Sequence, residues 1–177
     1  MPRTVLTPPA GGAPSPDIPN WAWHEYGNRV GFWRLLKTFD ELSVTGVLAI
    51  NGTAVDSYAP ISQAAHDRGW EFIGHGVHQK SIQGENDERD VIALAMQMIE
   101  DFIGTRPPGW LGPGLKETFD TPDILKELGV EYVFDWVLDD LPSWMTTTHG
   151  PLLSIPYTLE LNDSPIYAGH QHHSSEM

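Results

Sequence analysis

Residues Glu71-Phe-Ile-Gly-His75-Gly-Val-His78 form an apolar run that ends in a turn carrying two histidines. Three further polar clusters follow short apolar stretches downstream. They are Arg106-Pro-Pro-Gly-Trp110, Tyr132-Val-Phe-Asp135-Trp136 and Asp139-Asp140. Enzymes built on open α/β sheets or α/β barrels assemble their active sites just past the carboxyl ends of successive strands. The order of these clusters therefore predicts a reaction centre as well as a fold class.

The segments around these clusters alternate between helical and extended patterns. Apolar residues at helical spacing predict helices over 26–42, over 58–67, from Asn86 to about Gly104, and from Thr121 to Gly129. In the third helix, we expect the buried face to consist of Val91, Leu94, Ala95, Met98, Ile99 and Phe102.

Short apolar runs predict strands over 45–50, 70–73, 131–136 and 152–157, and residues 106–114 are expected to form a polar loop. Helices that alternate with strands indicate right-handed crossovers and a largely parallel sheet, so the predicted class is α/β. About five strands can be counted, whereas a closed eight-stranded barrel takes roughly 250 residues. The 177-residue chain is therefore expected to form either an open sheet or part of a barrel.

Composition excludes several classes of function. The formal net charge is −14, and no basic stripe suited to nucleic acid or an anionic membrane is present. No apolar run approaches the roughly 20 residues that span a bilayer. Cysteine is absent, which excludes disulfides, thiolate metal sites and a cysteine nucleophile and fits a cytoplasmic protein. Residues 1–19 are rich in Pro and Gly and predict an irregular lead-in.

His75 and His78 support two chemical interpretations. A histidine pair three residues apart can bind Zn²⁺, but such a site needs a third protein ligand. Alternatively, one histidine serves as general acid or base, since its charge changes near neutral pH. Glycine on both sides of His75 lets a substrate approach the backbone closely. Two surface loop histidines without a chemical role fit the same turn.

The next clusters supply candidate partners for His75. The Arg106 guanidinium can hold a carboxylate group, with Trp110 as an aromatic wall beside it. Alternatively, Arg106 caps the preceding helix within a rigid connector. Asp135 ends an apolar strand, where it can hydrogen-bond Arg106 and hold it in place, or cap the next turn. Arg106 and Asp135 are accordingly predicted to join His75 as catalytic residues, with Trp110 binding substrate.

Taken in order, the motifs resemble those of the polysaccharide deacetylase (NodB-homology, carbohydrate esterase 4) superfamily. The similarity covers about residues 20–165. Within the superfamily, the chain most resembles the branch of the cofactor-independent allantoinases and related cyclic-amide hydrolases. It is carried by Glu25-Tyr26-Gly-x-Arg29-x-Gly31-x-Trp33-Arg34, Glu71-x-x-Gly-His75-Gly76, Arg106-Pro-x-Gly-Trp110, Asp135, Asp139-Asp140-Leu-Pro-x-Trp144, Ile155-Pro-Tyr157-Thr158 and Asn162-Asp163.

The resemblance implies a partial distorted (β/α) barrel of mostly parallel strands over residues 20–177. It also implies hydrolysis of a carbon–nitrogen bond in a small amide or a sugar acetamide. On the resemblance alone, Glu25 and Asp140 are candidates for binding substrate. The metal-dependent members carry His-x-x-x-His, whereas this chain has Gln79 at the second position and His78 one place earlier. This departure favours the metal-independent branch, with a Zn²⁺-dependent polysaccharide deacetylase using His75 and His78 as the alternative.

Two family motifs have no counterpart in the chain. The first acidic strand should precede residue 20, and the last strand should follow residue 177. We therefore expect a fragment, whose exposed barrel edges would favour self-association into homo-oligomers. A catalytically inactive fragment or binding module is a further alternative.

Overall fold

A computed structural model describes residues 15–163, 165 and 166 of the chain. Two compact units are present. One contains residues up to Lys37 together with those from Thr158 onward, and the other contains residues Thr38–Tyr157. The second unit holds the sheet and the segments around His75, so it is the one that positions the candidate site.

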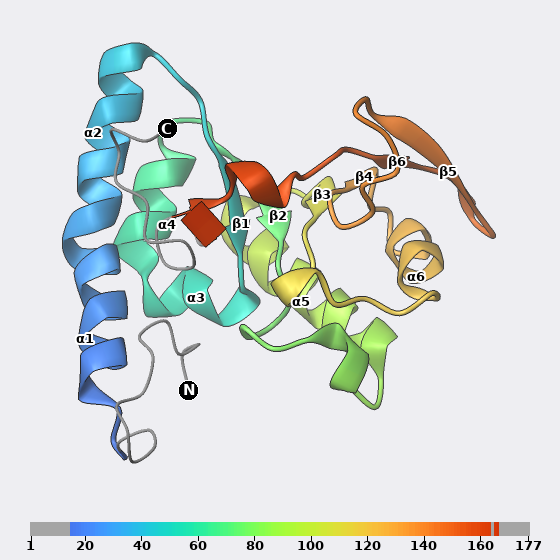
Figure 1. The fold of residues 1–177 in the computed structure, drawn as a ribbon, viewed down its shortest axis with the longest axis horizontal. Helices are drawn as coiled ribbons and strands as arrows, with labels where there is room; N and C mark the ends of the chain where they lie inside the picture. The colour runs from blue at the N-terminus through green and yellow to red at the C-terminus, as the bar shows by residue number, and fades with distance from the viewer. Residues whose placement is uncertain (1–14, 164, 167–177) are drawn as a thin grey trace. The chain divides into compact units, whose positions relative to one another are not determined.

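The second unit is built on one six-stranded sheet with the strand order β1-β2-β3-β4-β6-β5 (Figure 1). Strands β1 to β4 and β6 pair in parallel, and β5 pairs antiparallel with β6. The predicted α/β class with a mostly parallel sheet is confirmed, and the sheet is open within the described residues. The strands are β1 (Val47–Ile50), β2 (Glu71–Gly74), β3 (Gly109–Trp110), β4 (Tyr132–Val133), β5 (Ser143–Thr147) and β6 (Gly150–Ser154).

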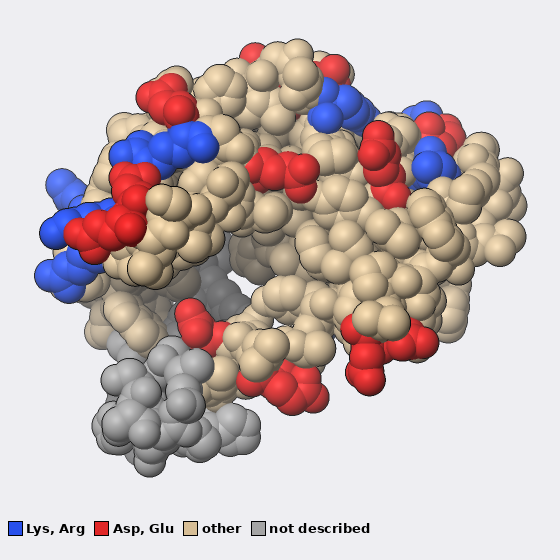
Figure 2. Space-filling view, turned by 90° about the horizontal axis from the view of Figure 1, so that it is seen from above, with Lys and Arg blue, Asp and Glu red and all other residues tan. Residues whose placement is uncertain are grey.

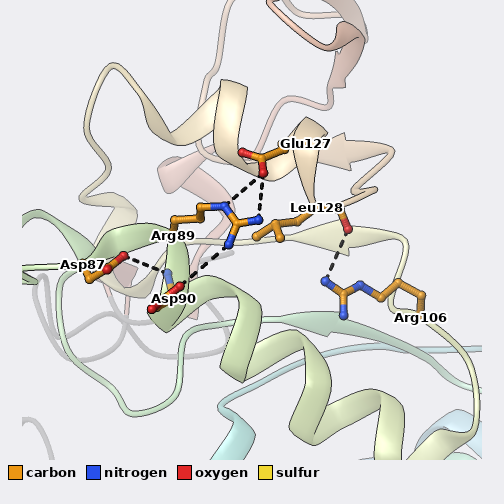
Figure 3. Close-up of polar contacts among 6 residues, drawn as sticks. All are labelled: Asp87, Arg89, Asp90, Arg106, Glu127 and Leu128. Atoms are coloured by element: carbon orange, nitrogen blue, oxygen red, sulfur yellow. Dashed lines mark hydrogen bonds and ion pairs between the residues drawn. The ribbon is translucent and has the colours of Figure 1, made fainter.

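Four helices of this unit connect or flank the strands. Helix α5 packs against β2 and α3, and α6 packs against α5 and the β5–β6 hairpin. Arg89 on α5 donates to Glu127 on α6 at 2.8 Å, which adds a polar link between the two helices (Figure 3). The helices are α3 (Gly52–Ser57), α4 (Ala59–His66), α5 (Glu88–Ile103) and α6 (Thr121–Glu127).

The first unit contains a helix that begins earlier than its sequence pattern predicts. Helix α1 (Ile18–Tyr26) runs through a π-helical turn (Gly27–Gly31) into α2 (Phe32–Leu42). Asp17 caps α1 by accepting from the Asn20 amide, and Pro19 fits the first turn. The expectation of an irregular stretch up to residue 19 is therefore wrong at residues 18 and 19, and residues 1–14 lie outside the described part.

The buried face of α5 is rotated from the predicted one. Ile92, Ala95, Met96 and Ile99 are buried, whereas Leu94 is 52% exposed. The buried set follows the i, i+3, i+4, i+7 spacing of a helix that packs along one stripe. Both sets contain apolar residues at helical spacing, so only contact with the sheet distinguishes them.

Two strands occur where the sequence pattern is weak. Strand β3 lies inside the predicted loop 106–114, because the neighbouring strands β2 and β4 supply its hydrogen bonds. Strand β5 reads Ser-Trp-Met-Thr-Thr, and its pairing with β6 across a tight turn defines it. The sequence pattern also fails to predict helix α3, since its six residues are too few to show a helical period.

The core beneath the middle of the sheet depends on a glycine. Trp110 is fully buried, and a Cβ atom built at Gly74 would lie 2.5 Å from its ring and 2.6 Å from the Met96 sulfur. Only glycine lets the Trp110 ring and Met96 approach the β2 backbone so closely. The absence of a side chain at position 74 therefore determines how β2 and β3 pack over α5.

Charge on the surface is predominantly acidic but dispersed. On the face shown in Figure 2, the Lys and Arg side chains of the described residues lie in small groups beside Asp and Glu and form no continuous basic stripe. Among the ion pairs, Arg68 meets Asp40 at 2.8 Å and Lys80 meets Glu85 at 2.6 Å. None of the helices in the described ranges is long and apolar enough to cross a membrane.

Replacing Gly74 with alanine tests the packing of Trp110. We expect Gly74→Ala to lower the free energy of unfolding by about 1–3 kcal/mol, because the new methyl group overpacks the core. Gly84→Ala is the matched control, since a Cβ atom there meets nothing within 4 Å. Urea unfolding of the two variants measures the difference, and equal midpoints would contradict the packing argument.

Candidate functional site

The candidate site lies at the carboxyl edge of the parallel strands. Asn51 follows β1, His75 follows β2, Leu111 follows β3, and Asp135 lies two residues after β4. Because the four strands run in parallel, these residues meet at one edge of the sheet. The structure therefore brings two of the predicted catalytic residues, His75 and Asp135, to the same edge.

His75 is held by backbone contacts on both sides. Its amide donates to the carbonyl of Ile50 at 3.1 Å, and its own carbonyl accepts from the Asn51 side chain. The ring nitrogen Nδ1 hydrogen-bonds the carbonyl of Leu111. A carbonyl can only accept, so Nδ1 carries the proton and Nε2 is the basic nitrogen of the neutral ring.

Burial keeps the His75 ring neutral. Loss of contact with water lowers the pKa of His75, and the hydrogen bond to Leu111 and the nearby Gln79 side chain offset this only in part. A neutral imidazole with a defined tautomer can accept a proton from water, which is the task of a general base. His75 thus has the protonation state that the predicted role requires.

His78 does not share the hydrogen-bond partner of His75. His78 is exposed, and its Nδ1 lies 3.1 Å from the Thr53 hydroxyl. Gln79, at the position of the second histidine of the metal-dependent motif, lies near the His75 side chain and acts to raise its pKa. Within the described residues, no group of three His, Cys, Asp or Glu side chains could hold a metal ion. The donors there do not make up a Zn²⁺ site, which needs at least three protein ligands.

Asp135 binds a different partner from the predicted one. Its Oδ2 accepts from the Gly112 amide at 2.7 Å. Gly112 directly follows Leu111, the residue whose carbonyl meets His75. Asp135 therefore supports the backbone segment beside His75 rather than a guanidinium group.

Glu117 is a buried acidic residue at this edge that sequence reasoning missed. It follows a 3-10 turn (Pro113–Leu115) and is only 9% exposed. Its Oε2 accepts from the Trp136 indole, and its carbonyl accepts from the Gln83 side chain at 2.6 Å. The segment Leu115-Lys116-Glu117 has no periodic pattern, so the sequence contains no signal that this carboxyl group faces inward.

Arg106 lies at the opposite edge of the sheet. It precedes β3, and its guanidinium donates to Glu100 at 3.1 Å and to the carbonyl of Leu128 at 3.3 Å (Figure 3 shows the second contact). It also lines a cavity with Trp70 and Glu71, which stand at the amino end of β2. The predicted contact between Asp135 and Arg106 is wrong, because Arg106 precedes β3 whereas Asp135 follows the parallel strand β4, which puts them at opposite ends of the strands. The alternative of a connector tied to the preceding helix is the one observed.

The three predicted substrate-binding residues differ in position. Trp110 is fully buried in the core, so the expectation that it forms a wall facing substrate is wrong in this structure. Asp140 lies on an exposed bend beyond the carboxyl edge. Glu25 lies on α1 in the first unit, and its role stays a prediction.

Comparisons with known proteins identify the family to which the chain belongs. The family model for polysaccharide deacetylase matches residues 23–133. The chain belongs to the polysaccharide deacetylase family. The sequence resemblance to this family is thereby confirmed, and with it the assignment of the partial α/β sheet to the NodB type.

Individual relatives of this deacetylase-family chain include both bacterial and fungal proteins. The peptidoglycan deacetylase of Helicobacter pylori is 25% identical over 155 residues, which cover 86% of this chain and 52% of that protein. A peptidoglycan deacetylase-like protein of Gibberella zeae is 27% identical over 111 residues, 60% of this chain and 33% of that protein. The crystal structure of Puue allantoinase superposes with a TM-score of 0.77 at 28% identity, covering 92% of this chain and 54% of that one. The chain thus spans about half the length of the allantoinase and the Helicobacter protein.

The protonation state of His75 can be measured directly. We expect its pKa in the folded chain to lie below the 6.5 of an ordinary histidine, because burial disfavours the imidazolium. The folded state is favoured in full above the unfolded-state pKa of His75, and this stability is lost as the pH falls from that value through the lower folded-state pKa. An NMR titration of the His75 Cε1 proton, folded and in urea, measures the shift. A folded value equal to or above the unfolded one would contradict the burial argument.

Arg106 is expected to stabilise the fold. Arg106→Gln should lower the free energy of unfolding by about 1 kcal/mol, since the ion pair with Glu100 is partly exposed and the bond to the Leu128 carbonyl is long. Lys116→Gln, at an exposed position, is the control for loss of a positive charge. Equal unfolding midpoints for the two variants in urea would show that the Arg106 contacts contribute nothing.

Proposed function

We propose that the chain forms one side of the active site of a hydrolase that cleaves a carbon–nitrogen bond in an amide or cyclic amide, of the type that allantoinase acts on. The observation that carries this proposal is His75, a partly buried imidazole whose pKa is lowered and whose Nδ1 binds the Leu111 carbonyl at the carboxyl edge of the sheet. The likeness to Puue allantoinase supports the cyclic-amide class. Action on a small molecule, self-association and a cytoplasmic location are parts of the same proposal.

At the carboxyl edge, His75 would act as the general base of the hydrolysis. Nε2 accepts a proton from water while the water oxygen forms a bond to the amide carbon. The carbon–nitrogen bond then breaks, and the proton passes to the departing nitrogen. Asn51, whose side chain holds the His75 carbonyl, and Leu111, whose carbonyl holds Nδ1, keep the ring oriented for both transfers.

A metal-dependent polysaccharide deacetylase is the second candidate, because the curated relatives include peptidoglycan deacetylases. It requires His75 and His78 to bind one ion together with an acidic ligand from outside the described residues. In the structure the Nδ1 atoms of the two rings face the Leu111 carbonyl and the Thr53 hydroxyl. That arrangement favours the first candidate. An inactive or purely binding member of the family is the third.

Turnover assays distinguish these candidates. The chain is incubated with allantoin, hydantoin and N-acetylglucosamine oligomers, with and without a chelator. We expect hydrolysis of a cyclic amide that persists in chelator and falls by about 100-fold or more in His75→Gln, as for loss of a general base. His149→Gln, at an exposed histidine, is the matched control.

Each other outcome counts against the proposal. Release of acetate from the oligomers that chelator abolishes would support the metal-dependent deacetylase. No turnover of any of these substrates would overturn both enzymatic candidates and leave the inactive member.

A further inference from the structure

Two carboxyl groups converge beneath the backbone that supports His75. A Cβ atom built at Gly112 would lie 2.6 Å from Oδ1 of Asp135 and 3.2 Å from Oε1 of Glu117. Both oxygens therefore reach the same small volume beside Gly112. Asp135 comes from the end of β4, and Glu117 comes from the loop after β3.

The hydrogen bonds around the pair satisfy one oxygen of each group. The Gly112 amide donates to Oδ2 of Asp135 at 2.7 Å, and the Trp136 indole donates to Oε2 of Glu117. The remaining oxygens, Asp135 Oδ1 and Glu117 Oε1, are buried and make no hydrogen bond of normal geometry with a described residue, although the Trp110 indole lies close enough to Glu117 to lower its pKa. Buried acceptors without donors are costly, but one proton held between these two oxygens would satisfy both.

Electrostatics agrees with this geometry. Burial and the neighbouring Asp135 carboxylate raise the pKa of Glu117 to about 9, with a smaller contribution from Glu88 on α5. Burial also raises the pKa of Asp135, while its hydrogen bond to Gly112 and the neighbouring Glu117 side chain hold it lower. Two neighbouring buried carboxyl groups cannot both ionise cheaply. At neutral pH the pair therefore retains a proton, predominantly on Glu117.

We propose that Glu117 and Asp135 share one proton and act together as a positioning pair for His75. The connection runs through two adjacent residues, since the Gly112 amide is bound by Asp135 and the Leu111 carbonyl is bound by His75 Nδ1. The pair holds Leu111 and Gly112 in place, and this in turn keeps the His75 proton on Nδ1. Its catalytic consequence rests on the proposed role of His75, whereas the shared proton and its effect on the tautomer do not.

Two substitutions of similar length at position 117 separate the proton from the shape of the side chain. In Glu117→Gln the amide nitrogen can donate to Asp135 Oδ1 while the amide oxygen accepts from Trp136, so the variant imitates the protonated acid. Glu117→Met fills the same space but leaves Asp135 Oδ1 and the Trp136 indole without partners. Glu131→Gln, at an exposed position, is the control for changing a carboxylate to an amide.

The first measurement is the urea midpoint as a function of pH. A carboxyl group whose pKa is raised on folding stabilises the fold at low pH, and this stability is lost as the pH rises from the unfolded value of 4.5 to about 9. We expect the midpoint of the wild-type chain and of Glu131→Gln to fall over this range. In Glu117→Gln the fall should be much smaller. A fall in Glu117→Gln equal to that of the wild type would overturn the shared proton.

The second measurement is the His75 tautomer, read from its ring ¹⁵N shifts. We expect Nδ1 to be protonated in the wild type and in Glu117→Gln, and the two tautomers to be mixed in Glu117→Met. An unchanged tautomer in Glu117→Met, or a mixture in Glu117→Gln, would overturn the positioning role. If Glu117→Met fails to fold, the pH dependence and the His75 tautomer of Glu117→Gln together decide the proposal. Neither measurement needs turnover, so a failure of the proposed hydrolase activity is distinguishable from a failure of the pair.

Discussion

The close approach of Trp110 to Gly74 is the constraint on which the rest of the site depends. With no side chain at position 74, the indole packs directly on the β2 backbone and on Met96. This contact sets β3 beside β2, and the Leu111 amide then bonds the Gly74 carbonyl at 3.0 Å. The next carbonyl and amide of the chain, at Leu111 and Gly112, are thereby placed against His75 and Asp135. A buried core contact thus leads, within three residues, to the hydrogen bonds of the candidate site.

The same physical effect acts on both kinds of titratable group at the carboxyl edge. Burial lowers the pKa of His75 and raises that of Glu117, so in each case the neutral form is favoured. The site therefore carries less charge at neutral pH than its residue types suggest. A neutral base beside a carboxyl pair that holds a proton is suited to moving protons between water and a leaving nitrogen. A cation site would instead require those carboxyl groups to be ionised and facing the ion.

The carboxyl and amino ends of the parallel strands carry different kinds of residues. At the carboxyl edge, His75 binds the Leu111 carbonyl, Asp135 binds the adjacent Gly112 amide, and Asp135 and Glu117 each have one buried oxygen without a hydrogen-bond partner among the described residues. At the amino edge, Arg106 is occupied by Glu100 and by the Leu128 carbonyl, which ties the connector before β3 to the ends of two helices. This division is the usual one in α/β proteins, where chemistry gathers at the carboxyl ends of the strands and the opposite end contributes stability.

The sequence by itself determined the α/β class, the family resemblance and the position of His75 after a buried strand, because each depends on local patterns and ordered motifs. It could not determine which apolar stripe of α5 is buried, since Leu94 and Met96 both fit a helical period and only the sheet selects Met96. Nor could it show that Arg106 and Asp135 lie at opposite edges, because strand β3 runs between them and carries no pattern of its own. The pairing of Glu117 with Asp135 likewise arose only in the tertiary structure. The turn after β3 brings the Glu117 side chain, from a loop without a periodic pattern, next to Gly112. No local pattern in the sequence predicts that contact.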